Sequence, residues 1–258
     1  MYPVDLEGRT AVVFGVANHR SIAWAIADIL HQAGARVAVC YQNERVRESV
    51  AKLVSAWHDP LLLECDVSSD DNVAAAFDRL AGEVGALDIV VHSIAFAERD
   101  DLGGRFVDTS REGFQVAMDV SAYSLVSIAR HAAPLMGANG GSILTLTFQA
   151  STRVFPGYNV MGTAKAALEN EVRQLASDLG RDNIRVNAIS AGPLDTLSSR
   201  AIAHYRDMKR AHAERSPMGR NITAEEVAKT GLFLCSDLST GITGEIVHVD
   251  TGYNIMGI

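Results

Sequence analysis

A tyrosine and a lysine that lie seven positions apart, Tyr158 and Lys165, are the residues of this chain best suited to act together in catalysis. On an α-helix, seven residues turn through about 700° and rise about 10.5 Å, so both side chains leave the same face. A tyrosine that stays protonated at neutral pH can donate a hydrogen bond to a carbonyl, and the lysine can hold ribose hydroxyls. Such a pair also arises by chance, so its meaning depends on its surroundings.

The composition predicts one globular α/β domain over residues 1–258. Of the 258 residues 48% are hydrophobic, which is ample for a buried core. The 31 acidic residues outnumber the 23 basic ones and give a formal net charge of -8. That charge argues against a surface that neutralises the phosphates of a duplex, so we expect no nucleic-acid partner.

The cysteines and the apolar segments indicate where the protein works. Cys40, Cys65 and Cys235 lie in separate apolar stretches, which is typical of buried free thiols in a reducing compartment and not of a disulfide framework or a metal site. No apolar run approaches the roughly 18 residues of a membrane span, and the N-terminus lacks the pattern of a secretory signal. We therefore expect a cytoplasmic protein with no bound metal and no membrane association.

Short apolar runs alternate with longer helical patterns along the chain. Nearly continuous apolar strands are typical of a parallel sheet covered on both faces, and the helical stretches between them are long enough for crossovers. We predict a Rossmann-like, doubly wound α/β fold, with a parallel sheet of about seven strands and helices on both faces. The strands are expected at 10–14, 36–40, 61–63, 87–91, 142–146, 185–189 and 245–249, and helices at 22–33, 73–80 and 164–179.

Two local patterns indicate a helix start and a turn. Thr223 and Glu226 have the spacing of a capping box at the start of the helix before the last strand. The glycine-rich segment 137–141 could suggest a phosphate-binding loop. Because it precedes a strand and does not open a helix, we interpret it as a plain turn.

The loop after the first strand is where a doubly wound sheet binds a dinucleotide. It lacks the usual three-glycine fingerprint, and keeps only Gly15 directly after the strand and Ser21 at the start of the next helix. Ser21 has two compatible interpretations. It can cap the helix, and it lies beside the N–H groups that a pyrophosphate needs.

Residues after the second and third strands fit the adenosine half of a dinucleotide. Gln42 stands where an acidic residue usually meets the adenosine ribose, and it offers no positive charge to a 2'-phosphate. This favours NADH, although Arg45 and Arg47 leave NADPH open. Asp66 and Val67 offer a carboxylate and an apolar wall for adenine, while Asp66 can equally be a turn residue.

Several segments, taken together, indicate a resemblance to a known protein family that no single motif could establish. They are 15–18 with 21–23, Tyr41-Gln42, 65–67, 91–97, 158–165, 190–193 and 241–245. In this order, from about residue 5 to the C-terminus, the chain resembles the enoyl-acyl-carrier-protein reductases of bacterial type II fatty acid synthesis. They form a divergent branch of the short-chain dehydrogenase/reductase superfamily. Usual members of that superfamily have lysine four positions after the tyrosine, and here that position is Gly162, which favours the enoyl reductase branch.

The resemblance implies NADH-dependent reduction of a 2-enoyl thioester. Hydride goes to C3, and negative charge collects on the thioester oxygen before C2 is protonated. Tyr158 is then expected to hydrogen-bond that oxygen, a contribution on the order of 3 kcal/mol, and Lys165 to hold the nicotinamide ribose. The implied cofactor contacts are Gly15, Ser21, Ile22, Gln42, Asp66, Val67, Ile94, Lys165, Leu194, Asp195, Thr196, Leu197 and Ser198. The expected substrate contacts are Ala97, Phe96, Phe148, Tyr158 and Met161, of which Phe96 and Met161 can equally be ordinary core residues.

Two positions depart from the family pattern. Many members have a second active-site tyrosine ten residues before the catalytic one, and here that residue is Phe148. Some relatives, including mycobacterial long-chain enoyl reductases, also have phenylalanine there, so we expect altered substrate preference or inhibitor binding and not a loss of activity. Asp195 stands where arginine is frequent, and the role of that arginine is not transferred to it.

The segment after Pro193 has two expected roles. Gly192-Pro193 followed by small and polar residues suggests a hinged substrate-binding lid around 194–215. An acidic acyl carrier protein, the partner that the resemblance implies together with a homotetramer, could be steered by a local charge of +4. A solvated helix face explains that charge equally well. It comes from Arg200, Arg206, Lys209, Arg210, Arg215 and Arg220 against Asp207 and Glu214.

Two other functions remain open on the sequence. One is a short-chain oxidoreductase that acts on a carbonyl, which Gly162 disfavours. The other is a catalytically inactive NAD-sensing protein, which the presence of both Tyr158 and Lys165 disfavours.

Overall fold

The computed structural model describes residues 4–197, 199, 202 and 205–257. Within these residues seven parallel strands form one sheet in the order β3-β2-β1-β4-β5-β6-β7, as predicted. The direction of winding reverses between β1 and β4, and ligands of such sheets bind at this switch point. The strands are β1 (Thr10–Phe14), β2 (Arg36–Tyr41), β3 (Leu61–Glu64), β4 (Ile89–His92), β5 (Gly141–Thr147), β6 (Ile184–Ala191) and β7 (Ile246–Val249).

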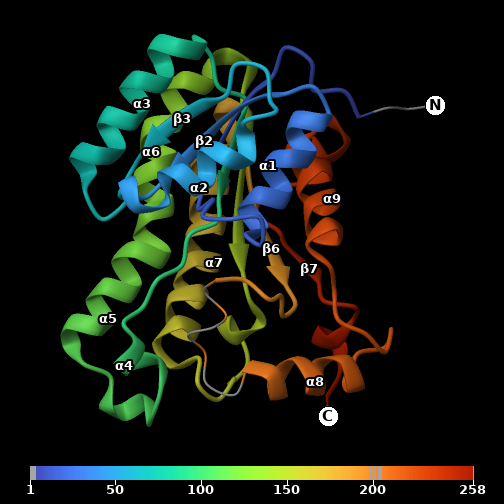
Figure 1. Cartoon of the computed structure of the whole chain (residues 1–258). Coiled ribbons are helices and arrows are strands. Elements are labelled where there is room, and N and C mark those ends of the chain that lie inside the picture. The colour runs from blue at the N-terminus through green and yellow to red at the C-terminus, as the bar shows by residue number, and fades with distance from the viewer. Residues whose placement is uncertain (1–3, 198, 200–201, 203–204, 258) are drawn as a thin grey trace.

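Helices cover both faces of the sheet (Figure 1). One face carries α1 (Ile22–Gln32), α2 (Glu44–Val54) and α9 (Ala224–Cys235), and the other carries α3 (Asp70–Val84), α6 (Ser124–Met136) and α7 (Asn159–Leu179). Three further helices, α4 (Arg99–Leu102), α5 (Arg111–Met118) and α8 (Tyr205–Arg215), extend past the carboxyl ends of the strands. Part of the chain therefore stands over the edge where the predicted site residues gather.

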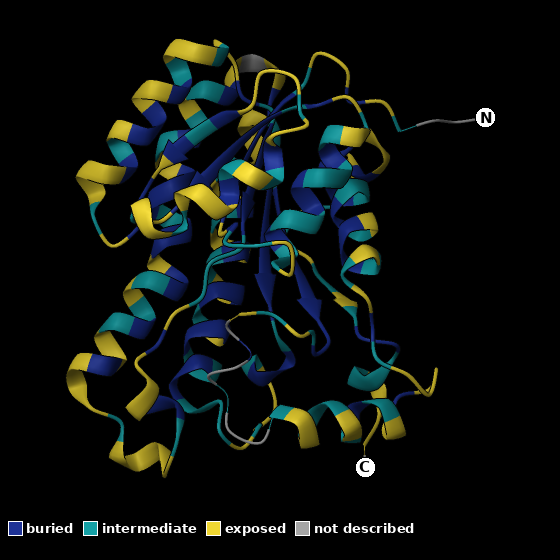
Figure 2. Ribbon diagram, in the orientation of Figure 1, coloured by how far each residue is buried: buried dark blue, intermediate teal, exposed yellow. Residues whose placement is uncertain are grey.

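The core has two apolar layers because successive residues of a strand point to opposite faces. Val12 and Phe14 of β1 pack in one cluster with Leu168 of α7. Val13 packs in the other cluster with Ile26 of α1. Figure 2 shows the buried sheet between helices whose outer faces are exposed.

Three local predictions are confirmed, namely the capping box, the turn before β5 and the buried free cysteines. The capping box is confirmed, because Thr223 Oγ1 accepts the N–H of Glu226 at 3.2 Å and the Glu226 carboxylate accepts the N–H of Thr223 at 2.8 Å. The segment before β5 is a short 3-10 turn, Gly137–Asn139. The three cysteines are free and buried. Among the described residues, no helix is both long enough and apolar enough to cross a membrane.

Candidate functional site

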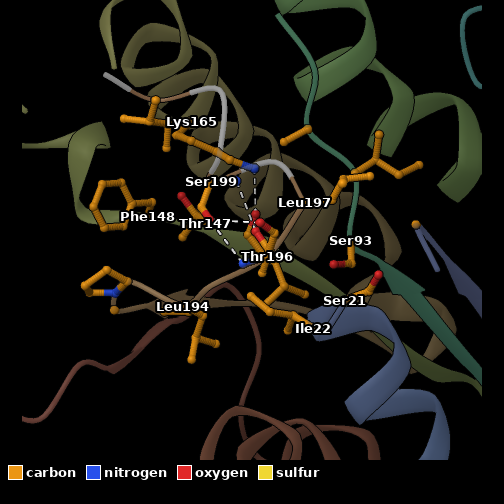
Figure 3. Close-up of a pocket in the computed structure, with 18 of the residues that line it drawn as sticks. Ser21, Ile22, Ser93, Thr147, Phe148, Lys165, Leu194, Thr196, Leu197 and Ser199 are labelled. Atoms are coloured by element: carbon orange, nitrogen blue, oxygen red, sulfur yellow. Dashed lines mark hydrogen bonds between the residues drawn. The ribbon is translucent and has the colours of Figure 1, made fainter. Parts of the chain in front are cut away.

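A cavity of ≈ 210 Å³ lies at the carboxyl edge of the sheet, beside the switch point between β1 and β4. The ends of β5 and β6, the start of α1 and the first residues of α8 also contribute to its wall. Figure 3 shows Ser21 and Ile22 at the start of α1 and Lys165 across the cavity from them. The structure thus brings together ten of the predicted site residues: Gly15, Ser21, Ile22, Ile94, Phe148, Tyr158, Lys165, Leu194, Thr196 and Leu197.

Gly15 allows the loop after β1 to pack directly on the end of β4. Its φ is +93°, in the left-handed region, and a Cβ at this position would lie 2.0 Å from the carbonyl oxygen of Ser93. Neither the conformation nor the contact suits a residue with a side chain. The glycine therefore lets the loop backbone lie against the end of β4 at the floor of the cavity.

Ser21 occupies the N-cap position of α1, but its side chain does not cap that helix. Instead its Oγ accepts the N–H groups of Ala17 at 3.1 Å and Asn18 at 3.2 Å, and so folds the preceding loop. The capping interpretation of Ser21 is therefore wrong. The first turn of α1 faces the cavity without a side-chain cap, an arrangement suited to an anion.

Tyr158 lies directly before α7 and not within its first turn. It is the N-cap residue, with φ -103°, and the helix begins at Asn159, whose φ of +32° is left-handed. The Asn159 side chain holds this bend by donating to the carbonyl oxygen of Gly103 at 2.9 Å. The prediction that one α-helix carries both Tyr158 and Lys165 is therefore wrong for Tyr158, which lies just before the helix. Both side chains nevertheless line the cavity.

The phenol of Tyr158 is suited to donate a hydrogen bond. Burial raises its pKa, and the field of Tyr205 acts in the same direction, so the hydroxyl keeps its proton at neutral pH. The hydroxyl makes no hydrogen bond with any described residue. The Phe148 ring packs against it, with centroids 5.1 Å apart and an angle of 54° between the planes.

Lys165 is a buried ammonium, with 4% of the residue exposed. Its Nζ donates to the carbonyl oxygen of Leu146 at 2.8 Å. Burial lowers its pKa to about 8, and the negative charge of Glu169 opposes that decrease. Because this pKa lies above 7, the group is mostly cationic at neutral pH.

The segment after Pro193 is fastened to α8. The hydroxyl of Tyr205 donates to the carbonyl oxygen of Leu194 at 2.5 Å, and Lys209 Nζ lies 2.6 Å from Asp195 Oδ2. Thr196 and Ser199 bond to one another through backbone and side chains. Asp195 points to the helix and does not line the cavity. Ser198, also predicted as a contact, lies outside the described residues.

The remaining predicted cofactor contacts lie beside the cavity. Gln42 follows β2 and is exposed, while Asp66 and Val67 follow β3. Because β2 and β3 are parallel neighbours, these three residues share the carboxyl edge of the sheet on the side of β1 away from β4. That position suits the far end of an extended ligand that crosses the switch point.

The predicted substrate contacts divide into two groups. Ala97 and Met161 are buried in a small apolar cluster that packs against Tyr158, so Met161 is a core residue in this structure. Phe96 is 48% exposed, and its backbone N–H and C=O are both bonded to the hydroxyl of Ser121. Phe148 lines the cavity itself.

Within the described residues, three of the six basic residues between 200 and 220 are paired with acidic ones. Lys209 bonds to Asp195, Arg210 to Asp207 at 2.9 Å, and Arg220 to Glu226 at 2.6 Å. Arg200 lies outside the described residues. These pairs weaken the expected basic patch and favour the solvated helix face. In the described part of the chain, no cluster of three His, Cys, Asp or Glu side chains could hold a metal ion.

Sequence reasoning missed two polar residues at the site. Thr147 lines the cavity, and its hydroxyl donates to Glu169 Oε1 at 2.8 Å. Glu169 is one helical turn after Lys165, a spacing that could have drawn attention to it. No comparable sequence signal marks Thr147, because it reads as an ordinary strand residue.

The chain is similar to proteins of one family over nearly its whole length. The sequence profile of the family described as Enoyl-(Acyl carrier protein) reductase matches residues 15–254, which include every residue that lines the cavity. The NADH-type enoyl-acyl-carrier-protein reductase FabI of Bacillus cereus is 51% identical over 254 residues, which are 98% of this chain and 99% of that protein. The NADPH-type FabI of Staphylococcus aureus is 47% identical over 253 residues, which are 97% of this chain and 98% of that one. The crystal structure of the Anaplasma phagocytophilum enoyl-acyl-carrier-protein reductase in complex with NAD has a TM-score of 0.95 at 46% identity and covers 99% of this chain and 97% of its own.

Proposed function

The chain belongs to the enoyl-acyl-carrier-protein reductases of the short-chain dehydrogenase/reductase superfamily, and we propose that it reduces the 2,3-trans double bond of its thioester substrates with NADH through Tyr158 and Lys165. The observation that carries these roles is the pair itself. A protonated phenol and a buried ammonium line one cavity at the switch point of the sheet.

The residues around the cavity fit a dinucleotide. Gly15 lets the loop pack against the Ser93 backbone at the floor of the cavity, and the uncapped start of α1 presents N–H groups to a diphosphate. Gln42 can hydrogen-bond the adenosine ribose and offers no positive charge to a 2'-phosphate. Arg45 and Arg47 are exposed on α2, and Arg47 forms a surface pair with Glu44 at 3.1 Å. NADH is thus favoured and NADPH is not excluded. When bound, NADH supplies the hydride that reduces C3.

Each catalytic residue has one task in this proposal. Tyr158 donates a hydrogen bond to the thioester oxygen, and this bond strengthens as negative charge gathers there. Lys165 holds the hydroxyls of the nicotinamide ribose and adds positive potential to the site. Because the phenol stays protonated, it stabilises the enolate oxygen as a donor and does not act as a base.

The walls of the cavity suit an acyl chain. Phe148, Leu197, Ile202 and Met208 give apolar surface beside Tyr158. The segment 194–215 acts as a lid over this surface, and the bonds from α8 to Leu194 and Asp195 fasten its beginning. Gln42, Asp66, Val67 and Ile94 keep their proposed cofactor contacts, and Phe96 and Ala97 their proposed substrate contacts. Asp195 instead pairs with Lys209, and Met161 packs in the core.

We also propose that the enzyme acts on acyl-carrier-protein thioesters in the cytoplasm as a homotetramer. Exposed apolar side chains near α5 could be covered by another subunit, because Phe106 is 53%, Val107 71% and Phe114 40% exposed. Light scattering coupled to size-exclusion chromatography tests the tetramer, and a monomer at micromolar concentration would contradict it.

The activity is tested by following NADH oxidation after addition of crotonyl thioester or of acetoacetyl thioester. We expect oxidation with the enoyl substrate and little with the carbonyl substrate. The reverse preference would identify a carbonyl reductase, and no oxidation with either substrate would contradict catalysis.

A further inference from the structure

Glu169 is a buried carboxylate for which the reaction above gives no role. It is 6% exposed and lies on α7 one turn beyond Lys165. A carboxylate taken out of water costs several kcal/mol unless hydrogen bonds and opposite charge compensate. Its burial one helical turn from a buried cation therefore calls for an explanation.

The end of β5 holds both charged side chains of α7. The carbonyl oxygen of Leu146 accepts from Lys165 Nζ at 2.8 Å, and the hydroxyl of the next residue, Thr147, donates to Glu169 Oε1 at 2.8 Å. Two consecutive strand residues thus bind two side chains one helical turn apart. Because Thr147 and Lys165 both line the cavity, this double attachment reaches the proposed cofactor site.

The other titratable groups near Lys165 carry no negative charge at neutral pH. Directly before α7, Tyr158 is a protonated phenol, and from α8 Tyr205 has a raised pKa as well. From β4, His92 bonds to the hydroxyls of Thr145 and Ser124, both at 2.8 Å, and burial and Lys165 lower its pKa to about 3. Among the described residues, Glu169 supplies the charge that favours the ammonium.

From this arrangement we infer that Glu169 is a positioning residue: Thr147 fixes it one helical turn from Lys165, where its charge keeps Lys165 cationic while the Leu146 carbonyl orients the ammonium. The inference rests on the proposed role of Lys165. In physical terms, burial at the site pushes the lysine toward its neutral form, and the carboxylate one turn away offsets that effect. A neutral lysine would hold ribose hydroxyls less strongly and would add no positive potential.

The direct test is a titration of Lys165 in the protein without cofactor. The chain has only four lysines, Lys52, Lys165, Lys209 and Lys229, so carbon-13 NMR of ε-labelled lysine resolves each one. Lys165→Arg assigns the signal. We expect Lys165 to titrate near pH 8 in the wild type and about one unit or more lower in Glu169→Gln, which keeps a hydrogen-bond acceptor for Thr147 but removes the charge.

Glu169→Asp is the matched control, because it keeps the charge and changes the geometry. We expect its Lys165 titration to stay closer to the wild type than to Glu169→Gln. A purely structural role for Glu169 predicts that both variants lose stability while the titration stays in place, and that result would overturn the inference. If Glu169→Gln does not fold, a midpoint in Glu169→Asp displaced by a full unit would also overturn it.

The pH profile of kcat/KM gives a second readout. Loss of the Lys165 proton lowers activity on the alkaline side, so this limb should move to lower pH in Glu169→Gln while the value near pH 6 stays within about threefold. Lys165→Met separates the two hypotheses. If the Lys165→Met variant binds NADH as tightly as the wild type, the proposed function of Lys165 is wrong. If Lys165→Met loses NADH binding but Glu169→Gln leaves the Lys165 titration unchanged, only the inference about Glu169 is wrong.

Discussion

The ring of Phe148 lies 5.1 Å from the ring of Tyr158, centroid to centroid, and the two planes meet at 54°. This tilted packing fixes the phenol from one side and brings no second hydroxyl to it. The hydroxyl of Tyr205, which also lines the cavity, is bonded to the Leu194 carbonyl, so Tyr158 is the tyrosine available as a donor at this point.

Phe148→Tyr restores the tyrosine that many family members have at this position. We expect kcat with crotonyl thioester to change by no more than about threefold, because Tyr158 alone suffices to stabilise the enolate oxygen. Steady-state kinetics measures this, with Phe148→Leu as the control for lost aromatic packing. A gain above tenfold would mean that the missing hydroxyl limits the natural enzyme.

Gly15→Ala should weaken NADH binding by at least about tenfold, because the added Cβ would collide with the Ser93 carbonyl and push the loop toward the ligand. Gly8→Ala is the matched control, since Gly8 has a φ of +79° but nothing within 4 Å of a built Cβ. Both variants are expected to lose about 1 kcal/mol of stability from the left-handed conformation. Equal NADH affinity of the two, measured by fluorescence titration, would show that the close approach at Gly15 does not matter.

Tyr205→Phe removes the hydrogen bond between α8 and the Leu194 carbonyl. The lid should become looser, so we expect a several-fold higher KM, a small change in kcat and about 1 kcal/mol less stability in urea. Limited proteolysis within 194–215 should become faster. Lys209→Met, which breaks the more exposed pair with Asp195, is expected to have the smaller effect, and the opposite ranking would contradict this view of the lid.

Lys209→Glu combined with Arg210→Glu tests the steering of acyl carrier protein. If these residues attract an acidic carrier, kcat/KM should fall much more for the carrier-bound substrate than for the coenzyme A ester, and the difference should shrink at high salt. Because both side chains already pair with carboxylates, we expect the difference to be modest, about tenfold or less. Equal losses for the two substrates would remove the steering hypothesis.

The sheet could be predicted because its signal is local. An apolar strand such as β1 is recognised from its own residues alone. The predicted strand positions differ from the observed ones by only a few residues. The capping box at Thr223 is equally local. No bounds were predicted for α2, α4, α5, α6 and α8, although α5 and α6 are amphipathic.

The details of the site depend on contacts between distant segments. Nothing near Tyr158 in the sequence shows that Asn159 bends the backbone by bonding to Gly103, or that Asp195 pairs with Lys209. Ser21 likewise sits where a cap is expected, yet binds the loop before it. Glu169 differs from these cases. Its spacing from Lys165 is visible in the sequence, but only the structure shows that it is buried, and the burial is what indicates a role.

In the proposed reaction Tyr158 stabilises the enolate oxygen by donating a hydrogen bond. This role is tested most directly by comparing Tyr158→Phe with the wild type in single-turnover reduction of crotonyl thioester, with NADH affinity measured alongside. We predict that the rate falls by about a hundredfold or more while NADH affinity is retained. A variant that keeps the full rate would contradict the account.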